Sequence, residues 1–267
     1  MPSYKFVPVN IRSRLIKILN LSNILSETTI SKAFLSLLTN RPIVYNGFEL
    51  SNYGVWLASN YKDKTFDFAI RSYRNGLDKI LKSISEDFNF VDIGANQGVF
   101  TLVAAKNRFC KRIYCFEPNL KVLGNLQRNL EFNNVLNHEI HKVAITKTDG
   151  VLKFFVPEYH SGAGHVVAND SNYNQEINSI SRNSLNVIFE KVQHPLFIKI
   201  DVQGMELEVI IELLNSNLNC KIGYLFVEVD LNYGHFKDIS QILSDNNFSE
   251  VSRFGSKSYF DIFYKRL

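Results

Sequence analysis

Acidic and small residues alternate in the stretch Asp92-x-Gly94-x-Asn96-x-Gly98, which follows a short hydrophobic run and precedes a helical pattern. A glycine-containing turn between a buried strand and a helix places backbone N–H groups at one crevice, where nucleotides bind in α/β sheets. In the dinucleotide fingerprint the second glycine lets the backbone approach a pyrophosphate, and Asn96 stands in its place here. The Asp92 carboxylate would repel phosphate and favour a cationic ligand.

Glu117 ends the next hydrophobic run, YCFE, and so reaches the same edge of a parallel sheet. A carboxylate at that position accepts hydrogen bonds from ribose hydroxyls. A ligand with a ribose, a positive centre and no phosphate is S-adenosylmethionine, which we therefore predict as the cofactor. The alternative is that Asp92 and Glu117 cap helices or form surface ion pairs.

Two more pairs of charged residues stand in later hydrophobic runs: Lys199 and Asp201 in FIKID, and Glu228 and Asp230 in FVEVD. Residues two apart on a strand point to the same face, so these charges converge at the mouth of the sheet. We predict Asp201 as the base for an acceptor hydroxyl, with Lys199 and Glu228 as further catalytic residues. A buried ion pair for Lys199 and helix capping for Asp201 remain open.

Four of the six histidines lie within residues 138–165, which invites a metal or base hypothesis. His138 and His141 have no matching cysteine pair, so zinc is not expected. His160 and His165 flank the loop SGAG, which we predict to be a lid over the substrate, and His165 is a second candidate for the base. The carboxylates at the sheet mouth are compatible with Mg²⁺, but nothing in the sequence requires a metal.

A sheet of parallel strands would bring these residues together, and the chain alternates strand and helix patterns as such a sheet demands. Two final runs separated by a short turn predict an antiparallel hairpin. We therefore predict an α/β fold with a doubly wound, mostly parallel seven-stranded sheet that ends in this hairpin. The predicted strands are 89–94, 112–117, 138–146, 151–158, 195–201, 223–230, 248–254 and 259–267, with helices over 99–107, 119–133, 205–216 and 236–247.

The first part of the chain, residues 1–64, is predicted to be a helical and short-strand extension of a main domain over residues 65–267. Apolar residues recur at helical spacing within residues 10–40, beside several basic residues. Docking onto the main domain is the preferred interpretation, and peripheral membrane contact or homo-oligomer formation are the alternatives. Residues 41–50 predict a strand or strand pair, and residues 65–84 a helix.

Composition fits an ordinary globular protein, with 45% hydrophobic and 21% charged residues in a chain of 267. The net charge of +4 is spread along the chain, so a nucleic-acid partner is not expected. Three cysteines without metal-type pairing favour a reducing, cytoplasmic location. We expect no transmembrane segment, because polar residues interrupt every long apolar run.

Four segments, in order, resemble the FkbM-type S-adenosylmethionine-dependent methyltransferases: VDIGANQGVFT, FEPNLKVLGNLQRNLEFNN, IKIDVQGMELEVI and FVEVD. The resemblance covers residues 88–230 and implies a Rossmann-like methyltransferase fold. The family usually has Glu where Gln203 stands. By matching positions, the resemblance assigns the cofactor turn to Asp92, Gly94, Asn96 and Gly98, the ribose contact to Glu117, and the adenine edge to Val143, Ala144 and Ile145. We also predict that Ala95, Pro118 and Asp201 contact the cofactor.

The resemblance implies an O-methyltransferase that acts on a hydroxyl of a sugar, glycan or secondary metabolite. One alternative is an NAD-dependent oxidoreductase, which Asn96 and the terminal hairpin disfavour. Another is a non-catalytic binding or scaffold protein on the same fold, against which the intact Asp92, Glu117 and Asp201 argue.

Overall fold

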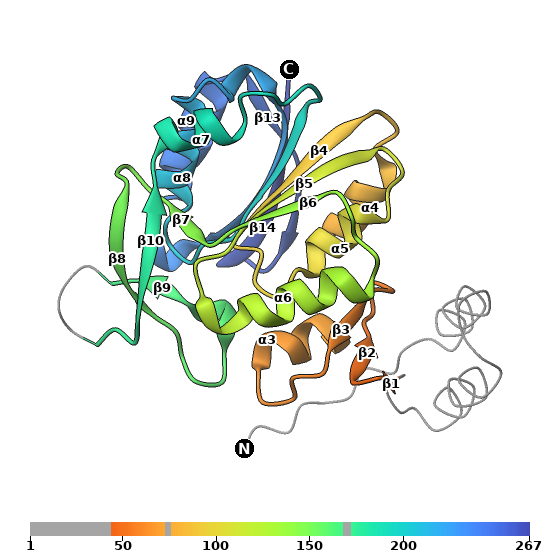
Figure 1. Cartoon of the computed structure of the whole chain (residues 1–267). Helices are drawn as coiled ribbons and strands as arrows, with labels where there is room; N and C mark the ends of the chain where they lie inside the picture. The colour runs from red at the N-terminus through yellow and green to blue at the C-terminus, as the bar shows by residue number, and fades with distance from the viewer. Residues whose placement is uncertain (1–43, 73–75, 168–171) are drawn as a thin grey trace.

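A seven-stranded sheet forms the centre of the computed structural model, which describes residues 44–72, 76–167 and 172–267. Its strand order is β13-β14-β12-β11-β4-β5-β6 (Figure 1). The last two strands pair antiparallel at one edge, and the other five are parallel, so the predicted sheet and its closing hairpin are confirmed. The strands are β4 (Phe88–Ile93), β5 (Cys110–Phe116), β6 (His138–His141), β11 (Leu196–Ile200), β12 (Ile222–Asp230), β13 (Phe248–Gly255) and β14 (Tyr259–Arg266).

Helices cover both faces of this sheet (Figure 1). Side chains alternate along the buried strands, so Phe88 and Phe90 pack in one apolar cluster while Val91 and Ile93 pack in the other. Each large side chain buried in this way contributes about 1.5–3 kcal/mol. The first cluster includes α4 (Leu77–Ser83), α5 (Val99–Ala105) and α6 (Leu120–Phe132); the second includes α7 (Arg182–Ile188), α8 (Glu206–Leu214) and α9 (Phe236–Asp245).

The predicted strand 138–146 is in fact two strands, because the chain leaves the main sheet after His141. β7 (Val143–Ile145) instead pairs in parallel with β10 (Gln175–Ile180). A second, four-stranded sheet of order β7-β10-β8-β9 results, with β8 (Gly150–Phe155) and β9 (His165–Val166). The predictions missed β10 and α7, since QEINSI has only two apolar residues and shows no clear strand pattern.

Residues 44–58 form a small antiparallel sheet of β1 (Val44–Tyr45), β2 (Phe48–Leu50) and β3 (Trp56–Ala58). This confirms the strand pair predicted near residues 41–50 and adds β3. The edge of β3 binds to asparagines of α6: Asn129 Oδ1 accepts from the Ala58 N–H at 2.7 Å, and Asn133 accepts from the N–H of Trp56 at 3.0 Å. Asn133 also donates to the Trp56 carbonyl at 2.8 Å. Asparagine side chains thus take the place of a neighbouring strand.

The single helix predicted over residues 65–84 is interrupted. It begins as α3 (Lys64–Asp67), continues as a π turn over Phe68–Ser72, and resumes as α4 after Gly76. The predicted boundary between an N-terminal extension (residues 1–64) and the main domain (residues 65–267) stays a prediction. The helices expected within residues 10–40, with their membrane or oligomer contacts, lie outside the described residues.

Candidate functional site

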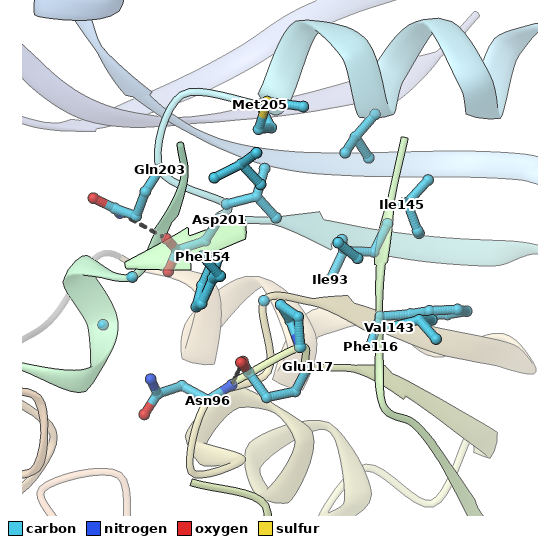
Figure 2. Close-up of a pocket in the computed structure, with 18 of the residues that line it drawn as sticks. Ile93, Asn96, Phe116, Glu117, Val143, Ile145, Phe154, Asp201, Gln203 and Met205 are labelled. Carbon is cyan, nitrogen blue, oxygen red and sulfur yellow. Dashed lines mark hydrogen bonds between the residues drawn. The ribbon is translucent and has the colours of Figure 1, made fainter. Parts of the chain in front are cut away.

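A pocket of about 720 Å³, counted with its open mouth, lies at the carboxyl ends of β4, β5 and β11 (Figure 2). The chain leaves β4 toward β5 and leaves β11 toward β12, so the pocket lies at the point where the connections diverge. Open α/β sheets bind ligands at such points. The lining residues come from the strand ends, from β7 and β8, from the start of α8 and from the loop before β9.

The turn after β4 is held tightly to its neighbours. Gly94 has φ +78°, and a Cβ atom there would lie 1.8 Å from the backbone oxygen of Asp201, so only glycine fits. The N–H groups of Gly94 and Ala95 both donate to the Phe116 carbonyl, at 2.9 and 3.1 Å. Asn96 also has a positive φ, +48°, which asparagine tolerates better than most residues. The turn therefore brings backbone within reach of a ligand.

Glu117 is the buried carboxylate of this pocket, with 4% of its surface exposed. Oε2 accepts a hydrogen bond from the Asn96 N–H at 2.6 Å, and Oε1 accepts one from the Asn119 N–H at 2.8 Å. Burial raises the pKa of Glu117 to about 7, although these two N–H groups act in the opposite direction. Each oxygen keeps a further lone pair, so the carboxylate can still accept hydrogen bonds from a ligand diol.

Asp92 and Lys199 form a buried ion pair below the pocket. They are register partners on adjacent strands, and Lys199 Nζ lies 3.1 Å from Asp92 Oδ1. The other oxygen of Asp92 accepts from the N–H and the hydroxyl of Thr101, at 3.0 and 2.6 Å. Neither charged residue is among the described residues that line the pocket. The structure thus shows Lys199 in a buried ion pair, which was the alternative to a catalytic role. It shows Asp92 accepting from the first turn of α5, which was its helix-capping alternative, so that Asp92 supports the turn from the side away from the pocket.

Lys199 also reaches the pocket floor from below. Its ammonium group donates to the Gly94 carbonyl at 2.8 Å and lies 3.5 Å from Asp201 Oδ2. Burial opposes its charge, but Asp92 and Asp201 together hold the pKa of Lys199 above its ordinary value. Lys199 therefore stays charged and fixes the position of both carboxylates.

Asp201 does line the pocket, and its side chain is 29% exposed. Figure 2 shows it with Gln203 across the pocket from Asn96 and Glu117. The Gln203 amide donates to Asp201 Oδ1 at 3.2 Å and to Glu228 Oε2 at 2.7 Å, and the Tyr259 hydroxyl donates to the other oxygen of Glu228. Burial and repulsion by Asp201 raise the pKa of Glu228 well above its ordinary value. Of the two carboxyl groups, Asp201 is the one with an ion-pair contact to the Lys199 ammonium.

The chemistry of the lining fits the predicted cofactor. Among the described lining residues there is no lysine or arginine, and the two charged members are Glu117 and Asp201. A diphosphate would find no counter-charge there. An apolar wall that suits a purine is formed by Phe116, Val143, Ile145, Met205 and Val209. S-adenosylmethionine has a purine, a ribose diol and a cationic sulfur, so the wall, Glu117 and Asp201 each match one of its groups.

The structure brings some predicted residues to the pocket and leaves others outside. Pro118, Val143, Ala144 and the loop SGAG contribute to the lining. Gly98 does not, and a Cβ atom there would lie 2.6 Å from Leu126 Cδ1, so this glycine serves helix packing. Ala95, buried beside Gly94, is also outside the lining of the described pocket.

The structure does not bring His165 into the pocket either. The described lining contains its neighbours Gly164 and Val166, while the imidazole packs against Phe155 with ring centroids 5.7 Å apart. Its Nδ1 atom lies 3.1 Å from the Ala163 carbonyl oxygen. His165 is therefore not placed to act as a base in this pocket.

Several lining residues were missed by the sequence interpretation. They include Thr65, Phe154 and Met205, which arrive from three different parts of the chain. The sequence carried a signal for Ser161 and Gly162, because the SGAG loop interrupts a strand pattern. For Thr65 there was no signal, since its place depends on how residues 60–65 fold back onto the domain.

Neither a metal-binding group nor a membrane-spanning helix is found among residues 44–72, 76–167 and 172–267. No group of three or more His, Cys, Asp or Glu side chains there is placed to hold a metal ion. In the same ranges every helix is too short or too polar to cross a membrane. Cys110, Cys115 and Cys220 are all free thiols.

Comparison with known proteins finds a match between residues 92–250 and the Methyltransferase FkbM domain. "Methyltransferase 1" of Beauveria bassiana (strain ARSEF 2860) is 23% identical over 185 residues, which are 61% of this chain and 73% of that protein. Among solved structures, M. capricolum TrmK in complex with S-adenosyl-homocysteine has 15% identity and a TM-score of 0.44, over 73% of this chain and 68% of that one. Precorrin-6y C5,15-methyltransferase from Geobacter metallireducens GS-15 has 16% identity and a TM-score of 0.42, over 72% and 88%.

Proposed function

Because the chain belongs to the FkbM methyltransferase family, we propose that it methylates a hydroxyl oxygen of a sugar, glycan or secondary metabolite. The family domain spans more than half of the chain and makes the protein an S-adenosylmethionine-dependent methyltransferase. This confirms the resemblance drawn from the four sequence segments. The match to a methyltransferase domain excludes the oxidoreductase alternative. A protein that had lost its chemistry would carry the same domain, so a transfer assay is needed to test the scaffold alternative.

The observation that carries the proposal is the Asp201 carboxylate in the pocket, opposite Glu117 (Figure 2). S-adenosylmethionine, when bound, supplies an electrophilic methyl group on sulfur. A hydroxyl is a weak nucleophile, so a base that takes its proton as it attacks accelerates the transfer. Asp201 is the partly exposed member of its carboxyl pair, and contacts with the Lys199 ammonium and the Gln203 amide fix its orientation. It is therefore our candidate for the base.

The surface beside Asp201 supports an uncharged, polyhydroxylated acceptor. Gln203 lines the pocket, and Tyr259 reaches it through Glu228. Tyr233 lies close to Gly204, where a Cβ atom would be 2.8 Å from its ring. Both tyrosines are partly exposed, so their rings can stack on the apolar face of a sugar while carboxylate and amide groups bind its hydroxyls. An anionic acceptor would meet Asp201 without a compensating cation in the described lining.

The proposal is tested by binding and by transfer. Calorimetry with S-adenosylhomocysteine should show binding, while NAD should show none. Incubation with methyl-labelled S-adenosylmethionine and a panel of neutral glycans, acidic glycans, hydroxylated metabolites and RNA should label a neutral hydroxyl compound. Labelling of RNA alone, or of a nitrogen atom in the product, would contradict the proposed acceptor class.

Cofactor affinity should depend on pH through Glu117. Ribose hydroxyls donate to its ionised form, and its pKa of about 7 means that the free protein holds a proton there at lower pH. Ligand binding must release this proton, so affinity should rise as pH increases through 7 and then level off. Between pH 6 and pH 8 the ionised fraction grows by about tenfold, and the Kd for S-adenosylhomocysteine should fall by about the same factor.

The matched control for this pH dependence is Glu117→Gln, which removes the titrating group but keeps the shape. The variant should bind S-adenosylhomocysteine more weakly and with a flat pH profile, measured by calorimetry in buffers of differing ionisation enthalpy. If wild-type affinity were the same at pH 6 and pH 8, Glu117 would not be the ribose ligand in an ionised form.

A further inference from the structure

Asp63, the N-cap residue of α3, is a buried carboxylate, 7% exposed, that lies outside the described pocket lining. It accepts four hydrogen bonds. Oδ1 accepts from the N–H groups of Thr65 and Ser161, each at 3.0 Å. Oδ2 accepts from the Gln97 side-chain amide at 2.7 Å and from the Ser161 hydroxyl at 2.6 Å. One side chain therefore joins three segments that lie far apart in the sequence.

The segment that Asp63 holds is residues 159–166, which we term the cover segment. Its Ser161, Gly162, Gly164 and Val166 line the pocket. Two more hydrogen bonds join it to the start of α3: the Gly162 N–H donates to Thr65 Oγ1 at 2.7 Å, and the Lys64 N–H donates to the Tyr159 carbonyl at 2.9 Å. The approach is close, since a Cβ atom on Gly162 would lie 2.9 Å from Thr65 Oγ1.

The same network reaches the cofactor turn. Asn96 Oδ1 accepts from the Gln97 N–H at 2.9 Å and lies 3.2 Å from the Ser161 hydroxyl, whose single proton points to Asp63 at the shorter distance. The Asn96 N–H donates to Glu117. The Gln97 carbonyl in turn accepts from Asn129 of α6 at 2.8 Å. A hydrogen-bonded path thus runs from Asp63 through the turn to the carboxylate that we assign to the ribose.

We propose that Asp63 is a positioning residue for cofactor binding, which fastens the cover segment and the Asn96–Gln97 turn to each other across the pocket. The proposal rests on the proposed function, because it takes the pocket as the cofactor site. Asp63 precedes residue 92, where the match to the family domain begins. In this proposal, residues before the family domain contribute to the cofactor site: Asp63 positions the cover segment, and Thr65 lines the pocket.

Replacing Asp63 by Ala tests this directly in the full chain. The change removes all four acceptor interactions, so the cover segment and the turn must be ordered by the ligand itself, and binding should weaken by about tenfold or more. We expect a higher Kd for S-adenosylhomocysteine by calorimetry. We also expect faster amide exchange at residues 159–164, with ligand-induced protection there reduced.

Asp63→Asn is the conservative variant and should restore much of the affinity. Gln97 Oε1 is buried without a hydrogen-bond partner, so the Gln97 amide can turn to accept from an asparagine at position 63. Asp67→Ala is the matched control, because Asp67 lies on the same helix but is exposed and pairs only with Arg71 among the described ion pairs. It should leave both the Kd and the exchange of the cover segment unchanged.

The outcomes separate the two proposals. A folded Asp63→Ala variant with wild-type Kd and wild-type exchange at residues 159–164 would overturn the role of Asp63 while leaving the proposed function intact. If that variant does not fold, Ser161→Ala replaces it: loss of affinity with faster local exchange supports the proposal, and no change in either overturns it. Failure of the wild-type chain to bind S-adenosylhomocysteine would defeat the proposed function, and the role of Asp63 with it.

Discussion

Turnover of the Asp201→Asn variant should fall by about 10²- to 10⁴-fold, the usual contribution of a positioned base. The asparagine keeps the shape and can still accept from Gln203, while Lys199 keeps its contacts with Asp92 and Gly94, so the fold should be preserved. S-adenosylhomocysteine has a neutral sulfur and does not need the Asp201 charge. Its Kd should therefore change by no more than about threefold. Initial rates with the acceptor found for the wild type, together with calorimetry, give both quantities.

Asp230→Asn is the matched control for this variant. Asp230 ends the same strand as Glu228, but its side chain accepts from the Asn232 N–H at 2.9 Å and does not belong to the described pocket lining. Rates of this control should stay close to those of the wild type. If Asp201→Asn lost affinity for S-adenosylhomocysteine as severely as turnover, the change would have disturbed the cofactor pocket itself, and the role of Asp201 as the base would be contradicted.

The sequence was informative where local chemistry alone decides a position. Gly94 and Glu117 could be placed because the strand–turn–helix pattern and the next strand end leave little freedom in where they lie. Asp92 was harder. Its residue type favoured a direct role on a cationic ligand, but its register partner is Lys199, which stands 107 positions later in the chain (199 − 92), and strand register over such a distance cannot be deduced from local patterns.

Long-range contacts also explain what the fold prediction missed. β4 and β11 are buried along their whole length and mostly apolar, and both were predicted within a few residues. β7 was not predicted as a separate strand, because only Lys142 lies between it and β6 in the sequence. The two are distinguished by their partners: β6 pairs with β5, whereas β7 pairs with β10. The place of Asp63 beside Ser161 likewise depends on a fold-back of 98 residues, for which neither segment carries a local signal.

Replacing Lys199 by Met should be the most damaging change to stability among those considered. Lys199 is 4% exposed and Asp92 is fully buried, so the variant leaves a carboxylate in the core with Oδ1 unpaired. Breaking a buried pair in this way costs about 3–5 kcal/mol. That is a large share of the 5–15 kcal/mol typical of a whole domain, so the variant should unfold at much lower urea concentration and accumulate poorly on expression.

The double variant Asp92→Asn/Lys199→Met separates the loss of a charge partner from the loss of packing. With both charges removed, no uncompensated carboxylate remains, so the double variant should be more stable than Lys199→Met alone, although the Lys199 bond to Gly94 is still missing. Lys111→Met provides the surface control: its pair with Asp87 has a similar distance, 2.9 Å, but both partners are exposed, and the expected change is within about 1 kcal/mol. Urea unfolding followed by circular dichroism measures the wild type, the single variants Asp92→Asn and Lys199→Met, the double variant and the surface control. If the losses of the two single variants simply added in the double variant, the Asp92–Lys199 pair would contribute nothing as a pair, and the charge balance that we assign to the pocket floor would have to come from other groups.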